Sequence, residues 1–321
     1  MPIPAPESSR SNPAPTRVRA ILNPAAGSRQ DVRDALEQAF AARPDLHWEI
    51  LETQAGDDAR RFAAEAVALG HDLVIACGGD GTVMEVAAGL KDSPVALAII
   101  PCGTANVLAK ELDLPDSVEA ALALALDPAA AIRAVDMGCV DGRLFLLRAG
   151  IGYEALYNLE TSREEKARLG RWAYLLAARR ALARLREVRY AITIDGETHT
   201  TRGITCMICN SAGVGIASLR MAGCASVGDG LLDVIVLRGF GLAQIARFLA
   251  SLVHSLLPFL RDNPPPLEDY WQAQTITVEC SRRQWMTLDG EPFKQSKQFT
   301  ASAVPQAVRV RVPAAAVEPV P

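Results

Sequence analysis

Hydrophobic residues in the N-terminal part of the chain follow two alternating patterns. Short apolar runs predict strands, and apolar residues that recur every three or four positions predict amphipathic helices between them. The predicted strands are Arg17–Leu22, His47–Thr53, Leu73–Ala76 and Val95–Ile100. The predicted helices are Gln30–Ala42, Asp57–Leu69, Thr82–Leu90, Ala105–Leu112 and Val118–Leu126. Strands that alternate with helices indicate a parallel, doubly wound α/β sheet.

Beyond about residue 134 the pattern changes to strand-like runs that are joined by turns. Asp141-Gly142 and Asp195-Gly196 are dipeptides typical of two-residue hairpin turns. We therefore expect a mainly antiparallel second domain, interrupted by helices near 165–187 and 241–260. Its predicted strands are Val135–Val140, Leu144–Ala149, Tyr190–Ile194, Ile204–Cys209, Leu232–Leu237, Thr275–Glu279 and Ala307–Val312.

This change of pattern divides the chain into four predicted regions. The two folded domains are expected at 17–134 and 135–312, with tails at 1–16 and 313–321. The first tail is rich in proline and serine, and it lacks the apolar stretch of a secretory signal. The sequence leaves open whether the chain forms a homodimer.

Two segments bear on contact with a membrane. In Gly241–Leu260 the polar residues form one narrow helical stripe, so we expect a largely buried helix rather than a transmembrane span. Arg163–Arg189 carries nine basic and three acidic residues. Its apolar residues suit a helix on a surface, either as a solvated structural helix or in contact with anionic lipid.

Charge and cysteine content narrow the class of protein. The net charge of −4 gives no global basic field for binding nucleic acid. Seven scattered cysteines, an odd number, favour a reducing compartment over a disulfide framework. Cys206 and Cys209 form a C-x-x-C on a predicted strand, where residues three apart point to opposite faces, so we do not expect a zinc site there.

Two glycine-rich turns supply the candidate chemistry. Cys77–Glu85 and Pro101–Asn106 each follow a predicted strand and lead into a predicted helix. Glycines at such turns let backbone N–H groups approach an anion, and the helix N-terminus adds a positive dipole. Ligands of doubly wound sheets bind at the carboxyl ends of the strands. A phosphate group is therefore the expected ligand, although the chain has no Walker A motif.

Six motifs occur in the order found in the diacylglycerol kinase catalytic-domain family, which this chain resembles over about residues 17–312. That family includes soluble bacterial diacylglycerol kinases, sphingosine kinases and ceramide kinases. The motifs are NPAAG (23–27), ETQAGDDA around Thr53, GGDGTVMEV (78–86), PCGTANVLA (101–109), GDGLLDV (228–234) and LDGEP (288–292).

The resemblance implies an ATP-binding α/β domain of the NAD kinase/diacylglycerol kinase-like type and a C-terminal antiparallel β-sandwich, with the active site in the cleft between them. It implies transfer of the γ-phosphate of ATP to a lipid hydroxyl and a requirement for Mg²⁺. It also implies a cytoplasmic protein that contacts the inner face of the membrane transiently. The residues that match nucleotide-binding positions are Asn23, Thr53, Gly78, Gly79, Asp80, Gly81, Thr82, Glu85, Gly103, Thr104 and Asn106.

Several of these polar residues have a second interpretation. A carboxylate beside phosphates needs a cation, so we expect Asp80 to act through Mg²⁺ or to orient the nucleotide, with a helix cap as the alternative. Thr82 suits a helix cap as well as a phosphate contact. Read alone, Thr53, Thr104 and Asn106 are more typical of caps than of ligands.

Two acidic turns lie in the second half of the chain. Asp289–Glu291 is typical of a hairpin turn, and the resemblance implies that Glu291 is the general base that takes the proton from the acceptor hydroxyl. The resemblance also implies a structural Mg²⁺ site in the earlier turn, bound by the carboxylate of Asp229 and by backbone carbonyls of Ser226 and Leu231.

One position departs from the family pattern, because Met84 stands where the family usually has asparagine. A thioether cannot hydrogen-bond a phosphate usefully. Two alternatives therefore stay open: a small-molecule kinase like NAD kinase, which also uses a GGDGT loop, and a non-catalytic regulator that binds lipid or nucleotide. PCGTAN and LDGEP favour the lipid kinases, and retention of Asp80 and Glu291 favours an enzyme. The sequence does not identify the acceptor lipid.

Overall fold

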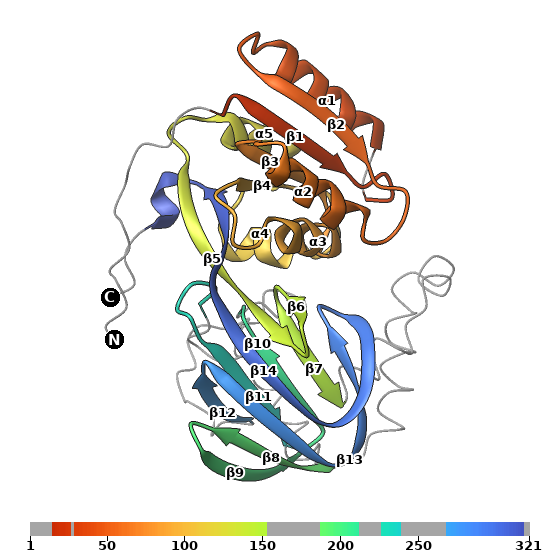
Figure 1. Cartoon of the computed structure of the whole chain (residues 1–321), viewed down its shortest axis with the longest axis vertical. Coiled ribbons are helices and arrows are strands. Elements are labelled where there is room, and N and C mark those ends of the chain that lie inside the picture. The colour runs from red at the N-terminus through yellow and green to blue at the C-terminus, as the bar shows by residue number, and fades with distance from the viewer. Residues whose placement is uncertain (1–14, 27–28, 153–186, 212–225, 239–267, 318–321) are drawn as a thin grey trace, which may run out of the picture. The chain divides into compact units, whose positions relative to one another are not determined.

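The computed structural model describes residues 15–26, 29–152, 187–211, 226–238 and 268–317 (Figure 1). The basic segment 163–189 and the predicted helices near 165–187 and 241–260 fall outside these ranges except for residues 187–189. The chain divides into two compact units. The first comprises residues 1–137, 211–230 and 304–321, and the second comprises residues 138–210 and 231–303.

The first unit is built on a parallel sheet. Its strands are β1 (Arg17–Leu22), β2 (His47–Glu52), β3 (Leu73–Gly78), β4 (Ala96–Pro101) and the last part of β14 (Glu291–Val312), in the order β14-β4-β3-β1-β2. All four pairings are parallel. Every residue of β3 and β4 is buried, as expected for strands that are covered on both faces.

Helices cover this sheet on both sides. α1 (Arg29–Ala41) and α5 (Val118–Leu126) pack into one apolar core with alternate residues of β1, β3 and β4. α2 (Asp58–Ala68) packs on α3 (Asp80–Leu90), and these two contact β1, β3 and β4. The short α4 (Val107–Glu111) follows β4. The predicted doubly wound α/β domain is therefore confirmed.

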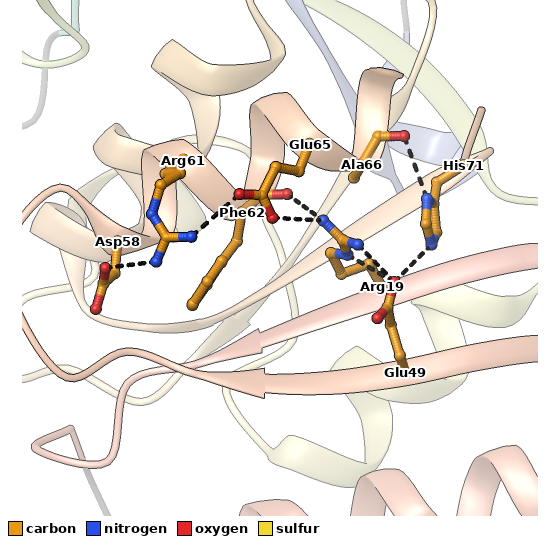
Figure 2. A network of polar contacts seen from close by, with 8 residues as sticks. All are labelled: Arg19, Glu49, Asp58, Arg61, Phe62, Glu65, Ala66 and His71. Atoms are coloured by element: carbon orange, nitrogen blue, oxygen red, sulfur yellow. Dashed lines mark hydrogen bonds and ion pairs between the residues drawn. The ribbon is translucent and has the colours of Figure 1, made fainter. Parts of the chain in front are cut away.

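A polar network ties α2 to the strands on its side of the sheet (Figure 2). Arg19 of β1 is only 3% exposed, and its guanidinium binds the carboxylate of Glu49 on β2 at 2.7 Å. It also donates to the carbonyl oxygen of Phe62 on α2 at 2.7 Å. The ring nitrogens of His71 lie 3.1 Å from Glu49 Oε1 and 3.2 Å from the carbonyl of Ala66. The buried charge of Arg19 is thus both paired and hydrogen-bonded, as burial requires.

The second unit is antiparallel. β5 (Ala131–Val140) and β14 each run from one unit into the other, and β6 (Arg143–Phe145) pairs with β5. Pairing runs in the order β12-β11-β10-β7-β13-β14; β8 pairs with β13, and β9 pairs with β8. The remaining strands are β7 (Arg148–Gly152), β8 (Val188–Ile194), β9 (Glu197–Gly203), β10 (Thr205–Cys209), β11 (Leu232–Leu237), β12 (Glu268–Ala273) and β13 (Thr275–Leu288). The predicted C-terminal β-sandwich is confirmed by these strands and by the family comparison given below.

Predicted strands in this unit were partly wrong in extent. The run Leu144–Ala149 forms two strands instead of one, because its middle residues point their N–H groups at a side chain and not at a neighbouring strand. β13 and β14 are much longer than their apolar cores, Thr275–Glu279 and Ala307–Val312. In the described part of the chain, no helix is both long and apolar enough to span a bilayer.

Candidate functional site

The predicted nucleotide-binding residues of the first unit gather at one edge of its sheet. The backbone N–H of Asn23, directly after β1, donates to the carbonyl of Cys77 in β3 at 2.9 Å. Thr53, directly after β2, donates to the carbonyl of Leu22 at 3.0 Å. The backbone N–H of the first residue after β4 donates in the same way to the carbonyl oxygen of Gly78. The ends of four neighbouring parallel strands are therefore joined, and they form the edge at which such sheets bind ligands.

The two glycine-rich loops touch each other through their backbones. A Cβ atom added to Gly103 would lie 2.5 Å from the Cα of Gly79 and 2.7 Å from Oδ1 of Asn106. A Cβ on Gly78 would lie 2.5 Å from the side chain of Thr82. Contacts below 3.0 Å leave no room for a side chain, so Gly78 and Gly103 are needed for packing within the protein.

Gly81 is different, because nothing lies within 4 Å of the position that its Cβ would take. It is exposed and lies in the first turn of α3, with no left-handed backbone. Glycine within a helix costs about 1 kcal/mol relative to alanine. Within the described residues, neither packing nor backbone conformation explains this glycine, and close approach of a ligand there stays a prediction.

Asp80 makes tertiary contacts with α4. Its Oδ1 accepts the N–H of Val107 at 2.7 Å, and the N–H groups of Asn106 and Leu108 also bind the carboxylate. Burial raises the pKa of the Asp80 carboxyl, and these backbone donors oppose the rise. The helix-cap interpretation of Asp80 is therefore correct for α4, which lies 27 residues further along the chain. A nucleotide or metal role for the same carboxylate stays a prediction.

Asn106 and Thr82 also contact protein groups. Asn106 has a left-handed φ of 48°, and its side chain exchanges two hydrogen bonds with the backbone of Gly103, at 3.0 and 2.9 Å. Thr82 is buried, and its hydroxyl accepts a hydrogen bond from the amide of Asn23 at 2.9 Å. These side chains shape the loops. Thr104 is exposed and Thr53 is partly buried at the same edge, and Glu85 is partly buried further along α3.

The two helices that start at this edge differ at their N-termini. The N-terminus of α4 is covered by the carboxylate of Asp80. The N-cap of α3 is Gly79, which has no side chain to cap the first turn, and in that turn the Asp80 carboxylate also binds its own N–H. Uncapped N–H groups at a helix N-terminus attract anions. The arrangement therefore suits a phosphate at the start of α3, beside Gly81.

The second unit holds the acidic hairpin. Asp289 and Gly290 have φ values of 48° and 86°, and Leu288 pairs with Glu291, which is a two-residue hairpin turn as predicted. Glu291 is exposed at the first position of β14. The shared cleft that the resemblance implies stays a prediction.

The predicted metal turn is bound by a carboxylate that was not predicted from the sequence. Asp136 of β5 is 1% exposed, and its two oxygens accept the N–H groups of Gly230 and Gln306, each at 2.6 Å. Burial and, to a smaller degree, the charge of Asp229 raise the pKa of Asp136. The sequence signal that could have indicated this residue is a single acidic side chain inside the apolar run Val135–Val140.

A magnesium site at this turn stays a prediction. The charge of Asp229 acts on the carboxyl of Asp136, so two acidic groups lie near each other at this turn. Hard oxygen donors of this kind are what Mg²⁺ prefers. Among the described residues no cluster of three or more His, Cys, Asp or Glu side chains could hold a metal, so binding there would depend on backbone carbonyls and water.

Comparison with known proteins gives matches over both units. The model of the diacylglycerol kinase catalytic domain matches residues 17–140, and that of the YegS C-terminal NAD kinase beta sandwich-like domain matches residues 148–312. A probable lipid kinase YegS-like protein of Pseudomonas aeruginosa is 34% identical over 314 residues, covering 93% of this chain and 95% of that protein. A diacylglycerol kinase of Bacillus subtilis is 30% identical over 281 residues, covering 86% and 89%.

A solved structure described as a diacylglycerol kinase from Bacillus anthracis has the same fold. The TM-score is 0.74 at 26% sequence identity, and the match covers 94% of this chain and 99% of that one. Both units therefore have counterparts in one experimentally determined chain.

Proposed function

Because this chain belongs to the diacylglycerol kinase catalytic-domain family, a family of phosphotransferases, we propose that it transfers the γ-phosphate of ATP to the hydroxyl group of a lipid. The names of the relatives, lipid kinase and diacylglycerol kinase, support a lipid acceptor. Their being kinases supports ATP as the phosphate donor. The acceptor that we propose is a diacylglycerol-like lipid or a long-chain base.

The observation that carries the proposal is the pair of glycine loops at the strand ends. Gly79 and Gly103 bring the loops into backbone contact, α3 begins there without a side-chain cap, and Gly81 leaves room beside it. Backbone N–H groups in this arrangement would hold the phosphates of ATP. Thr53 and Thr104 offer further polar contacts at the same edge, and Glu85 would contribute from α3.

Glu291 would act as the general base. Its carboxylate takes the proton of the acceptor hydroxyl, the hydroxyl oxygen forms a bond to the γ-phosphorus, and the bond from that phosphorus to the bridging oxygen of ADP breaks. The products are ADP, a lipid phosphate and one proton. Phosphoryl transfer depends mainly on alignment and on neutralisation of charge, so the hairpin must hold Glu291 in a fixed position.

Mg²⁺ would be held at the turn by Asp229, with the carbonyls of Ser226 and Leu231 and with Asp136 behind it. The ion would supply positive charge near the buried carboxylate of Asp136 and the exposed carboxylate of Asp229. The acceptor is embedded in a bilayer, so the enzyme must contact the membrane surface at least transiently, which supports a peripheral location on its inner face.

The test is a direct transfer assay. Purified full-length protein is incubated with γ-³²P-labelled ATP, Mg²⁺ and total bacterial lipid, and the labelled product is identified by mass spectrometry. We expect a labelled lipid phosphate that is not formed when EDTA is present. Labelled NADP formed from added NAD would identify a small-molecule kinase instead. Absence of Mg-ATP binding by calorimetry would indicate a non-catalytic regulator.

A further inference from the structure

Leu146 and Leu147, between β6 and β7, and Arg148, the first residue of β7, have their backbone polar groups bound by two other residues, Asp289 and Asn210. The N–H groups of Leu146, Leu147 and Arg148 donate to the carboxylate of Asp289 at 2.7, 2.8 and 2.9 Å. The carbonyls of Leu146 and Leu147 accept hydrogen bonds from the side-chain amide and the backbone N–H of Asn210, at 2.9 and 2.8 Å. The carbonyl of Arg148 accepts the backbone N–H of Asp289 at 2.8 Å.

We call this set of six hydrogen bonds the 146–148 clamp. It lies in the interior of the second unit, because Leu146 and Asn210 are 1% and 0% exposed. Burial raises the pKa of the Asp289 carboxyl, while the three N–H donors and the nearby charge of Arg148 oppose this rise. Loss of the carboxylate would leave three N–H groups without their acceptor, which is costly where water cannot replace it.

The clamp is attached to the turn that carries Glu291. Asp289 is the first residue of that turn, and only Gly290 separates it from Glu291. Its side chain binds residues that are 141 to 143 positions away in the sequence. The turn is therefore fixed to β7 through the side chain and through the backbone of one residue.

The hairpin turn itself does not need this attachment. Asp195-Gly196, between β8 and β9, has nearly the same φ values, 51° and 84°, and joins its strands in the same two-residue register. The carboxylate of Asp195 makes no hydrogen bond or ion pair in the part of the chain that the structure describes. Asp141, in the third Asp-Gly turn, pairs instead with the ammonium of Lys294.

We propose that Asp289 is a positioning residue for Glu291: the 146–148 clamp holds the turn so that the Glu291 carboxylate stays in place for proton transfer. Asn210 contributes by holding the same three residues from the other side. This inference rests on the proposed function, in which Glu291 is the base. A displacement of about 1 Å at a reacting group can cost roughly 100-fold in rate. A turn that holds Glu291 rigidly therefore has a measurable effect on the rate of transfer.

The test compares Asp289→Asn with Asp195→Asn, the same change in the turn that lacks a clamp. Asparagine tolerates the left-handed backbone in both turns, but at position 289 its NH₂ group faces backbone N–H donors. We expect D289N to lower kcat roughly 10- to 100-fold while the KM for ATP stays unchanged. D195N should leave both constants unchanged.

A double-mutant cycle separates positioning from a general structural effect. If Asp289 acts through Glu291, adding D289N to Glu291→Gln causes little further loss, because the group being positioned is already absent. A further loss as large as in the wild-type background would overturn the proposal. Thermal unfolding checks that each variant is folded, and if D289N does not fold, Asn210→Ser provides a milder release with the same expected non-additivity.

Hydrogen exchange gives a readout that does not depend on activity. We expect the amides of residues 146–148 to be protected in wild type and D195N, and to exchange at least tenfold faster in D289N. Unchanged protection would contradict the clamp. If the wild-type protein transferred no phosphate to any lipid, the proposed function would fail, and this measurement would still report on the clamp.

Discussion

Gly81 differs from the other glycines of the two loops in what surrounds it. Gly78, Gly79 and Gly103 are packed against backbone or side-chain atoms, whereas the Cβ position of Gly81 faces open space. Glycine therefore serves loop packing at three of these positions, and at Gly81 it leaves open space, where we predict a phosphate.

This difference predicts opposite results for two alanine substitutions. Gly81→Ala should keep the fold, with a gain in stability of up to about 1 kcal/mol from better helix propensity, but should weaken Mg-ATP binding by about tenfold or more. Gly103→Ala should destabilise the protein by about 1–3 kcal/mol, because its methyl group meets the backbone of Gly79. Thermal unfolding and calorimetry measure the two effects. Unaltered ATP affinity in G81A would contradict a phosphate at this position.

The sequence predicted which residues meet at the strand ends, but not the partners of their side chains. The glycine turns, Asn23 and Thr53 were placed correctly because a parallel sheet brings its strand ends to one edge. Asp80 could not be assigned to α4 in the same way, since its partner Val107 is 27 residues away. Asp136 was overlooked for the same reason: its contacts, Gly230 and Gln306, are distant in sequence.

At the scale of elements, α2 is held at both ends by charged groups (Figure 2). Near its end, the Arg19 network fixes the helix to β1 and β2. At its start, Asp58 accepts the N–H groups of Gln54 and Ala55, each at 2.9 Å, and pairs with Arg61. The hydrogen bond from Arg61, followed by those two backbone donors, lowers the pKa of Asp58 to about 2.

The low pKa predicts how acid affects this helix. Because the folded-state pKa of about 2 lies below the ordinary value of 3.8, Asp58 stabilises the folded state above about pH 4, and this contribution is lost as the pH falls towards 2. The difference in melting temperature between wild type and Asp58→Asn should therefore be largest above pH 5 and should shrink between pH 4 and 2. Asp57→Asn, one residue earlier and more exposed, is the control. A difference independent of pH would contradict the assignment.

Among the elements, apolar strands were easier to predict than polar ones. The bounds of β1, β11 and α5 were predicted without error, since each coincides with an apolar or periodic run. β9, with the sequence ETHTTRG, was missed because only one of its seven residues is buried. Its pairing with β8 fixes it as a strand, and such pairing is a tertiary property.

At the scale of the whole molecule, the chain passes between its two units more often than the predicted boundary near residue 134 suggests. Residues 211–230 and 304–321 return to the first unit, and the end of β14 adds a parallel strand beside β4. Composition along the sequence groups each segment with its neighbours in the chain, so it could not predict that these later segments belong to the first unit. The candidate metal turn at 226–231 lies at one of these crossings.

The most direct test of the account measures Glu291→Gln for binding and for transfer side by side. Calorimetry gives the affinity for Mg-ATP, and single-turnover transfer to lipid gives the rate. We expect unchanged affinity, because the predicted ATP-binding residues lie in the first unit, and a rate lower by about 10²–10⁴, the usual contribution of a general base. Transfer at the wild-type rate by the folded variant would contradict the central claim that Glu291 accepts the proton of the lipid hydroxyl.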